Sequence, residues 1–144
     1  MTQHLTQLHS NVAKSLALWH AMLARRDLGN LASIVDPNAI FRSPMVYAPY
    51  VSASAVILIL NTAFLVFEDF AYHRELASAD GLSVVLEFSA RVGDKNLKGI
   101  DLIRFNEQGL IVEFEVMVRP FSGLQALAAG MASRLGDQLS SLKS

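Results

Sequence analysis

The stretch GIDLIRFNEQGLI, residues 99–111, decides the fold of this chain. Apolar side chains recur at every second position, which predicts a strand with one apolar face. Turn residues follow at 106–109 and predict a tight connection to a second antiparallel strand. Asp101 breaks the apolar face, between Gly99 and Ile103. A charged, unpaired carboxylate on a core face is costly, so Asp101 must be paired, protonated or open to a water-filled cavity.

The same period continues on both sides of this stretch. Residues 84–91 and 113–119 place apolar residues at alternate positions, and GDKN at 93–96 predicts the hairpin turn between the first two strands. A further strand is expected at 72–77. The side chains expected on one inner face are Val84, Leu86, Phe88, Asp101, Ile103, Phe114, Val116 and Val118. The opposite face mixes charges with apolar residues, which predicts ion pairs across strands and a homodimer interface.

Residues before this sheet are predicted to be mainly helical. Apolar residues recur every three or four positions over residues 5–23, and Trp19 lies on the same stripe. A short second helix is expected at 31–35, the turn DPN at 36–38 and a short strand at 39–43. Because helices precede an antiparallel meander, the layout is α+β.

Two more helices are expected. The run AVILILNTAFLVF, residues 55–67, is 13 residues long, whereas a membrane span needs about 20. We therefore expect a buried helix, capped by Ser52 or Ser54, and no membrane partner. A final helix is expected to begin with a capping box formed by Ser122 and Gln125. Its apolar face comprises Leu124, Leu127, Met131, Leu135 and Leu139.

Composition excludes several classes of protein. The chain has 144 residues, of which 52% are hydrophobic and 17% charged, which fits a single domain over residues 1–144 and excludes a disordered tail. A net charge of −1 without basic clusters argues against a nucleic-acid partner. Cysteine is absent and the four histidines lack metal-ligand spacing, so no metal or cofactor is expected. No secretory signal is visible, so the expected location is cytoplasmic.

The order of elements and two local motifs resemble the nuclear transport factor 2-like superfamily. IDLIRF at 100–105, followed by a short turn, a glycine and a strand, is similar to the ketosteroid isomerases. DPNAIFRSP at 36–44 is similar to the start of the first strand in this superfamily, which includes SnoaL-like polyketide cyclases. The resemblance implies a cone-shaped, curved antiparallel sheet wrapped around N-terminal helices, with a C-terminal helix, a pocket and a homodimer.

The resemblance also implies site residues. The isomerase acid that hydrogen-bonds the substrate oxygen falls on Asp101. The isomerase tyrosine falls on Trp19, which offers only an indole N–H, and the general base, an aspartate before proline, falls on Ser43. Serine is a poor base without an activating neighbour. One of three functional residues is therefore retained, and steroid isomerisation by that mechanism is not expected.

Other residues are candidates for the pocket wall. Trp19 is either a core residue or a wall with its N–H aimed inward, and His73 is either a surface histidine or a pocket residue. Tyr47 and Tyr50 flank Pro49 in a loop, where they either cap the pocket or pack against the core. The remaining expected ligand-binding residues are Phe41, Ser43, Leu86, Phe88, Val116 and Val118.

Two functions fit these residues. The first is an isomerase, lyase or cyclase acting on a small apolar carbonyl compound, with Asp101 as acid or oxyanion donor. The alternative is a non-catalytic dimeric module that binds a hydrophobic metabolite. The retained Asp101 favours the enzyme, and the missing base favours the binding module. A purely structural role, as a buried carboxylate paired with a cation or hydroxyl, is the third interpretation of Asp101.

Overall fold

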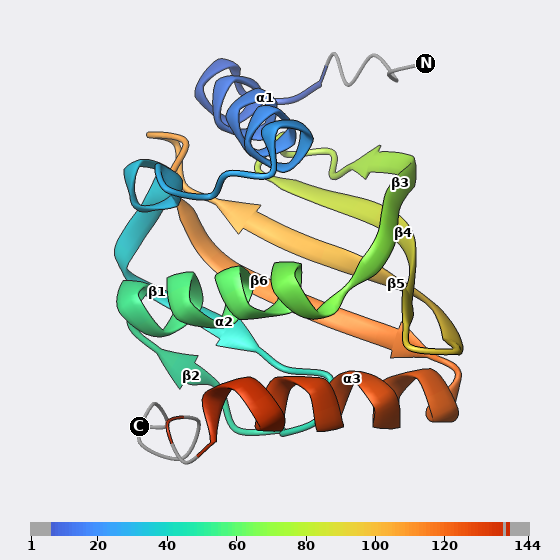
Figure 1. The fold of residues 1–144 in the computed structure, drawn as a ribbon. Helices are drawn as coiled ribbons and strands as arrows, with labels where there is room; N and C mark the ends of the chain where they lie inside the picture. Colours follow the sequence, from blue (N-terminus) through green and yellow to red (C-terminus); the bar gives the residue numbers. More distant parts are fainter. Residues whose placement is uncertain (1–6, 137, 139–144) are drawn as a thin grey trace.

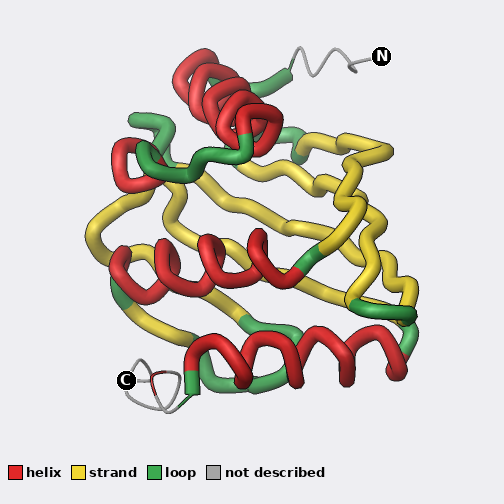
Figure 2. The backbone as a smooth tube through the Cα atoms, in the orientation of Figure 1, coloured by secondary structure: helices red, strands yellow, loops and turns green. Residues whose placement is uncertain are grey.

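In the computed structural model, which describes residues 7–136 and 138, helices lie on one face of a curved six-stranded sheet (Figures 1 and 2). The helices are α1 (Ser10–Arg25), the short 3₁₀ helix η1 (Leu31–Ile34), α2 (Ala53–Val66) and α3 (Phe121–Leu135). The strands are β1 (Val35–Arg42), β2 (Tyr50–Val51), β3 (Glu68–Ala77), β4 (Ser83–Val92), β5 (Lys95–Phe105) and β6 (Ile111–Arg119). α1 crosses one end of the sheet, while α2 and α3 lie side by side over the rest of that face (Figure 1).

The strands follow the order β2-β1-β6-β5-β4-β3. The predicted meander is confirmed, because β3, β4, β5 and β6 pair with antiparallel neighbours. β1 lies parallel to β6, however, so the sheet is mixed rather than wholly antiparallel. A parallel pair requires a long crossover in the chain, which the segment from β2 to β5 provides. The α+β class, the curved sheet and the C-terminal helix are as predicted.

The turn residues at 36–38 do not end a segment but lie within β1. The backbone N–H of Asn38 donates to Asp36 Oδ1 over 2.8 Å, and the pairing of β1 with β6 shifts register between Val35 and Ile40. Asx-turn chemistry at these positions therefore produces an irregularity in a longer strand. β3 is also longer than expected and begins at Glu68.

The apolar run at 55–67 forms the buried helix α2. Ser52, one of the two expected caps, accepts the backbone N–H of Ala55 at its Oγ over 3.2 Å. The helix packs against β1 and α3, and a Cβ on Gly130 of α3 would come within 2.7 Å of Val66, so glycine permits their close approach. Among the described residues, no helix is long and apolar enough to cross a bilayer.

The expected capping box at the start of α3 is wrong. The helix begins at Phe121, its N-cap is Pro120, and no side chain caps it. Ser122 lies inside the first turn, so its spacing to Gln125 matches the motif without the geometry. The apolar stripe is nevertheless buried at Leu127, Met131 and Leu135; Leu139 lies outside the described residues.

The two sheet faces differ as the alternation predicts. The inner face buries large side chains against the helices: Val84, Leu86, Phe88, Ile103, Phe114 and Val116. The outer face carries ion pairs, among them Glu87 with Arg74 at 2.8 Å and with Lys98 at 3.3 Å. These cations hold the pKa of Glu87 at about 2, well below its usual value, although burial opposes the shift.

Candidate functional site

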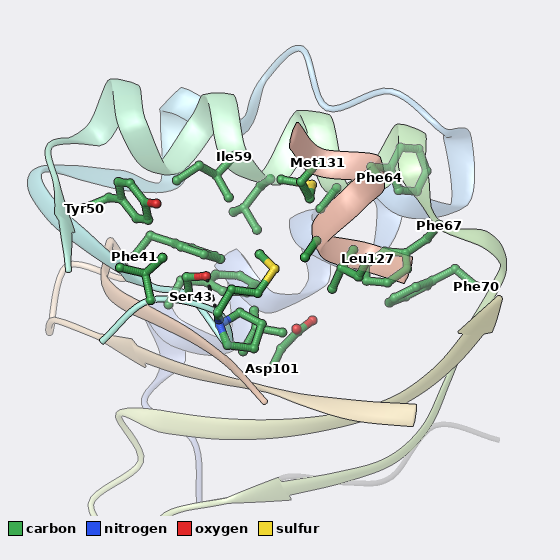
Figure 3. Close-up of a pocket in the computed structure, with 18 of the residues that line it drawn as sticks. Phe41, Ser43, Tyr50, Ile59, Phe64, Phe67, Phe70, Asp101, Leu127 and Met131 are labelled. Atoms are coloured by element: carbon green, nitrogen blue, oxygen red, sulfur yellow. Dashed lines mark hydrogen bonds between the residues drawn. The ribbon is translucent and has the colours of Figure 1, made fainter. Parts of the chain in front are cut away.

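A cavity of about 190 Å³ lies between the inner face of the sheet and helices α2 and α3 (Figure 3). Aliphatic and aromatic side chains form most of its wall, including five phenylalanines: Phe41, Phe64, Phe67, Phe70 and Phe114. The polar groups on the wall come from Trp19, Ser43, Tyr50, Tyr72 and Asp101. No lysine, arginine, histidine or glutamate is among its described lining residues. Such a wall favours an uncharged, mainly apolar ligand.

Asp101 lies in the middle of β5, where its backbone pairs with Leu86 of β4 and Val116 of β6. Its carboxyl group points from the sheet into the cavity, and only 6% of the residue is exposed (Figure 3). Tyr72 donates its hydroxyl hydrogen to Asp101 Oδ2 over 2.5 Å. Trp19 Nε1–H in turn donates to Tyr72 Oη over 3.0 Å. Three residues from α1, β3 and β5 thus form one hydrogen-bond chain.

The surroundings of the hydrogen-bond chain change the pKa values of Asp101 and Tyr72. Burial raises the pKa of Asp101 from 3.8 to about 7, because the charged form loses its hydration, and the hydrogen bond from Tyr72 lowers it in part. Burial and the adjacent Asp101 carboxylate raise the pKa of Tyr72 well above its usual value. Near neutral pH, Asp101 therefore exists in both protonation states, while Tyr72 keeps its proton.

The second oxygen of Asp101 remains open. Within residues 7–136 and 138, Oδ1 has no hydrogen-bond partner, and it is not sealed from the cavity as a fully buried atom would be. A ligand oxygen in the cavity can therefore accept a hydrogen bond from neutral Asp101 at Oδ1. Ser43, another polar residue on the wall, accepts the backbone N–H of Met45 over 3.0 Å and keeps its own hydroxyl hydrogen to donate.

The structure brings several of the expected site residues together. Trp19, Phe41, Ser43, Tyr50 and Val116 line the same cavity as Asp101. The N–H of Trp19 points to Tyr72 rather than to open space, so Trp19 is both a wall residue and part of the hydrogen-bond chain.

Five expected site residues lie elsewhere. Leu86 and Phe88 are fully buried in the core and do not line the cavity, and neither does Val118. Tyr47 is 99% exposed, so it packs neither on the cavity nor on the core. His73 is an exposed residue whose Nε2 lies 2.7 Å from Ser89 Oγ.

Sequence reasoning missed Tyr72, the partner of Asp101. Both parities of the expected strand at 72–77 mix polar and apolar residues, so the sequence does not fix which of them faces inward. With β3 starting at Glu68, Phe70 and Tyr72 both line the cavity, and His73 falls on the other parity. The alternation of Phe70 and Tyr72 was the available signal. The contribution of α3, through Leu127 and Met131, required the tertiary structure.

A curved sheet that holds helices and a pocket on one face agrees with the fold implied by the resemblance to the nuclear transport factor 2-like superfamily. Comparison with family models matches residues 16–114 to the SnoaL-like domain. The chain therefore belongs to the SnoaL-like domain family.

Solved structures agree with this assignment. A protein from Pseudomonas aeruginosa described as a steroid delta-isomerase is 62% identical, with a TM-score of 0.89, and the match covers 92% of this chain and 97% of that one. An uncharacterized Silicibacter pomeroyi protein with a cystatin-like fold is 27% identical, with a TM-score of 0.82 and coverage of 97% and 96%. A putative isomerase from Bacillus subtilis, at 18% identity and a TM-score of 0.61 over 82% and 93%, shows the shared fold alone. Comparison with curated proteins gives no match.

Proposed function

We propose that the cavity binds an uncharged, mainly apolar carbonyl compound and that the chain acts on it as an isomerase, lyase or cyclase. One observation carries the proposal: Asp101 turns toward an apolar cavity an oxygen that has no partner among the described residues. Burial raises the pKa of Asp101 to about 7, which agrees with a neutral form near physiological pH. In its neutral form Asp101 donates a hydrogen bond to the ligand oxygen. It thereby stabilises the negative charge that develops there when a neighbouring carbon loses a proton. The similarity to a protein described as a steroid delta-isomerase supports this class of reaction.

The cavity volume supports a small ligand. At about 190 Å³, it is somewhat larger than an apolar cavity of about 150 Å³ that holds one benzene molecule. We therefore expect a single-ring or short-chain compound rather than a four-ring steroid. The ligand gains affinity from burial against the phenylalanine-rich wall and orientation from Asp101 and Ser43.

A second candidate is a binding module without catalysis. The observation that favours it is the absence of a second carboxylate or an imidazole among the described lining residues. Asp101 supplies the acid half of a proton transfer, and the wall offers no comparable group for the base half. In the enzyme, water in the cavity would take the proton from carbon.

Exchange of hydrogen for deuterium separates the two candidates. 3-Methylcyclohexanone in D₂O loses the hydrogens next to its carbonyl group, and NMR follows their replacement. The enzyme proposal predicts exchange faster than in buffer alone, and predicts that Asp101→Leu abolishes the acceleration. Binding of the ketone without acceleration would assign the binding module, and the absence of both would reject the two candidates.

We also propose that two copies associate through the outer face of the sheet. Ile100 of β5 lies opposite Met117 of β6, and Met117 is 46% exposed. Covering this apolar pair on a second copy would remove it from water, while the surrounding ion pairs form a polar rim. The cytoplasmic location remains an expectation from the sequence.

A further inference from the structure

We propose that Trp19 and Tyr72 are positioning residues that place the acidic proton of neutral Asp101 on Oδ1, the oxygen open to the cavity. They do so because the hydrogen-bond chain through them runs in one direction only. This proposal rests on the proposed function, because the position of the proton affects a ligand only if the cavity binds one. The placement of the proton is itself a property of the protein without ligand.

The direction of the chain starts at Trp19. An indole nitrogen can only donate, so Tyr72 Oη must accept the hydrogen bond from Trp19 Nε1–H at 3.0 Å. The hydroxyl hydrogen of Tyr72 then has Asp101 Oδ2, at 2.5 Å, as its acceptor. Tyr72 Oη has no further hydrogen-bond partner among the described residues. If Asp101 Oδ2 donated instead, the Tyr72 hydrogen would lack an acceptor inside a largely apolar wall.

The direction decides which carboxyl oxygen carries the proton. A neutral carboxyl group has one hydroxyl oxygen and one carbonyl oxygen. Because Oδ2 accepts from Tyr72, it acts as the carbonyl oxygen, and the proton lies on Oδ1. The carbonyl oxygen of a ligand then accepts a hydrogen bond from Oδ1–H of Asp101. Without the chain, the proton would be shared between the two oxygens, and part of the neutral molecules would present an acceptor to the ligand carbonyl.

Packing holds the Tyr72 ring in place. Phe70 contacts it edge-on, with ring centroids 4.9 Å apart, and His20 does so at 5.4 Å. His20 also pairs with Glu75, and within residues 7–136 and 138 these two are the other titratable side chains next to Tyr72. Any test of the hydrogen-bond chain must therefore separate the titration of Asp101 from effects of His20 and Glu75.

The single tryptophan of the chain makes the test direct, because ¹⁵N-labelled protein gives one indole N–H resonance. Ionisation of Asp101 strengthens the bond from Tyr72, which makes Tyr72 Oη a better acceptor for Trp19. We expect the resonance to move with a midpoint near pH 7 in the protein without ligand. Asp101→Asn should abolish this titration and leave His20 and Glu75 in place. Tyr72→Phe should abolish it although Asp101 is still present.

Tyr50→Phe is the matched control, since it removes another phenolic hydroxyl from the same cavity wall and should leave the titration unchanged. Circular dichroism confirms that each variant is folded. A Trp19 indole resonance whose chemical shift does not change with pH in the natural protein would overturn the proposed hydrogen-bond chain. A titration that persists in Tyr72→Phe would also overturn it.

A second arm uses 3-methylcyclohexanone with a ¹³C-labelled carbonyl group at about pH 5, where Asp101 is neutral. Infrared spectra should show one hydrogen-bonded carbonyl band in the natural protein and an added band of free carbonyl in Tyr72→Phe. A single unchanged band in Tyr72→Phe would overturn the proton placement. If the natural protein binds no ketone while the indole titration holds, the proposed function fails and the directed chain stands.

Discussion

Tyr72 Oη lies 2.5 Å from Asp101 Oδ2 and occupies one of the two oxygens of the carboxyl group, which leaves the other open to the cavity. The bond favours the charged form of Asp101 and so opposes the effect of burial on its pKa. Two opposing contributions therefore set the pKa of Asp101 near 7: desolvation raises it, and one charge-assisted hydrogen bond lowers it.

Removal of the hydrogen bond should make Asp101 a weaker acid. In Tyr72→Phe the carboxylate loses a donor while its burial is retained, so we expect the pKa of Asp101 to rise above about 7. The ¹³C resonance of the labelled Asp101 carboxyl group, followed against pH, measures this directly. Tyr50→Phe should leave the midpoint in place, and an unchanged or lower midpoint in Tyr72→Phe would contradict the assignment.

The contribution of Asp101 to stability should fall as pH rises toward 7. Folding raises the pKa of Asp101 from 3.8 to about 7, so between these values the folded state binds more protons than the unfolded state. The stabilisation by neutral Asp101 is complete below about pH 4 and is lost through pH 7, at up to about 1.4 kcal/mol per pH unit.

Urea unfolding of the natural protein and of Asp101→Asn, at several pH values, isolates this contribution. The variant should lose the part of the slope that belongs to Asp101 and gain stability relative to the natural protein at pH 8. Parallel pH profiles would show that Asp101 does not titrate in this range.

Steroid isomerisation should be absent or very slow. The cavity has Ser43 where the isomerase mechanism needs a carboxylate, and its volume of about 190 Å³ is small for a four-ring substrate. Absorbance at the conjugated ketone product, with a β,γ-unsaturated 3-oxosteroid as substrate, provides the assay. Turnover typical of an efficient isomerase would refute this interpretation of the site.

A base introduced at position 43 should create activity on a smaller substrate. With 3-cyclohexenone, Ser43→Asp is expected to raise the rate of double-bond migration on the order of 10²-fold, the lower range of general base catalysis. Ser43→Asn, which matches the shape without the charge, is the control and should show no gain.

The outer sheet face should mediate a homodimer. Sedimentation at micromolar concentration is expected to show a dimer, and Ile100→Arg is expected to give a monomer because it would bury an unpaired charge in the interface. Leu65→Arg changes an exposed leucine on α2, on the opposite side of the sheet, and should leave the dimer intact. A natural protein that sediments only as a monomer would exclude this association.

Much of the fold was predictable because the signal was local. β4, β5 and β6 follow from the period-two burial of one face, and the turn residues between them indicate their boundaries. The parallel pairing of β1 with β6 was not predictable, because it joins segments about 70 residues apart and depends on the crossover between them. The turn residues at 36–38 predict a boundary before the strand, although β1 continues through them.

The site was predictable where family resemblance and core burial coincide, and not where tertiary contacts decide. Asp101 was identified because a carboxyl group on an apolar strand face requires an explanation. Trp19 is expected on the pocket wall, but the acceptor of its N–H depends on Tyr72, whose inward orientation follows from the alternation of side chains along β3, a strand that shifts register against β4 between Tyr72 and Glu75. His73, next in sequence, faces outward for the same reason.

We propose that Asp101 donates a hydrogen bond to a ligand carbonyl group inside the apolar cavity. Calorimetric titration of 3-methylcyclohexanone into the natural protein, Asp101→Asn and Asp101→Leu measures this hydrogen bond, with methylcyclohexane as the ligand without an oxygen. Asparagine keeps a donor and leucine removes it, so ketone binding should weaken by about 1–3 kcal/mol more in Asp101→Leu than in Asp101→Asn. Methylcyclohexane should show no such difference between the variants. Ketone binding by Asp101→Leu as tight as by the natural protein would contradict this role of Asp101 and make it a structural residue.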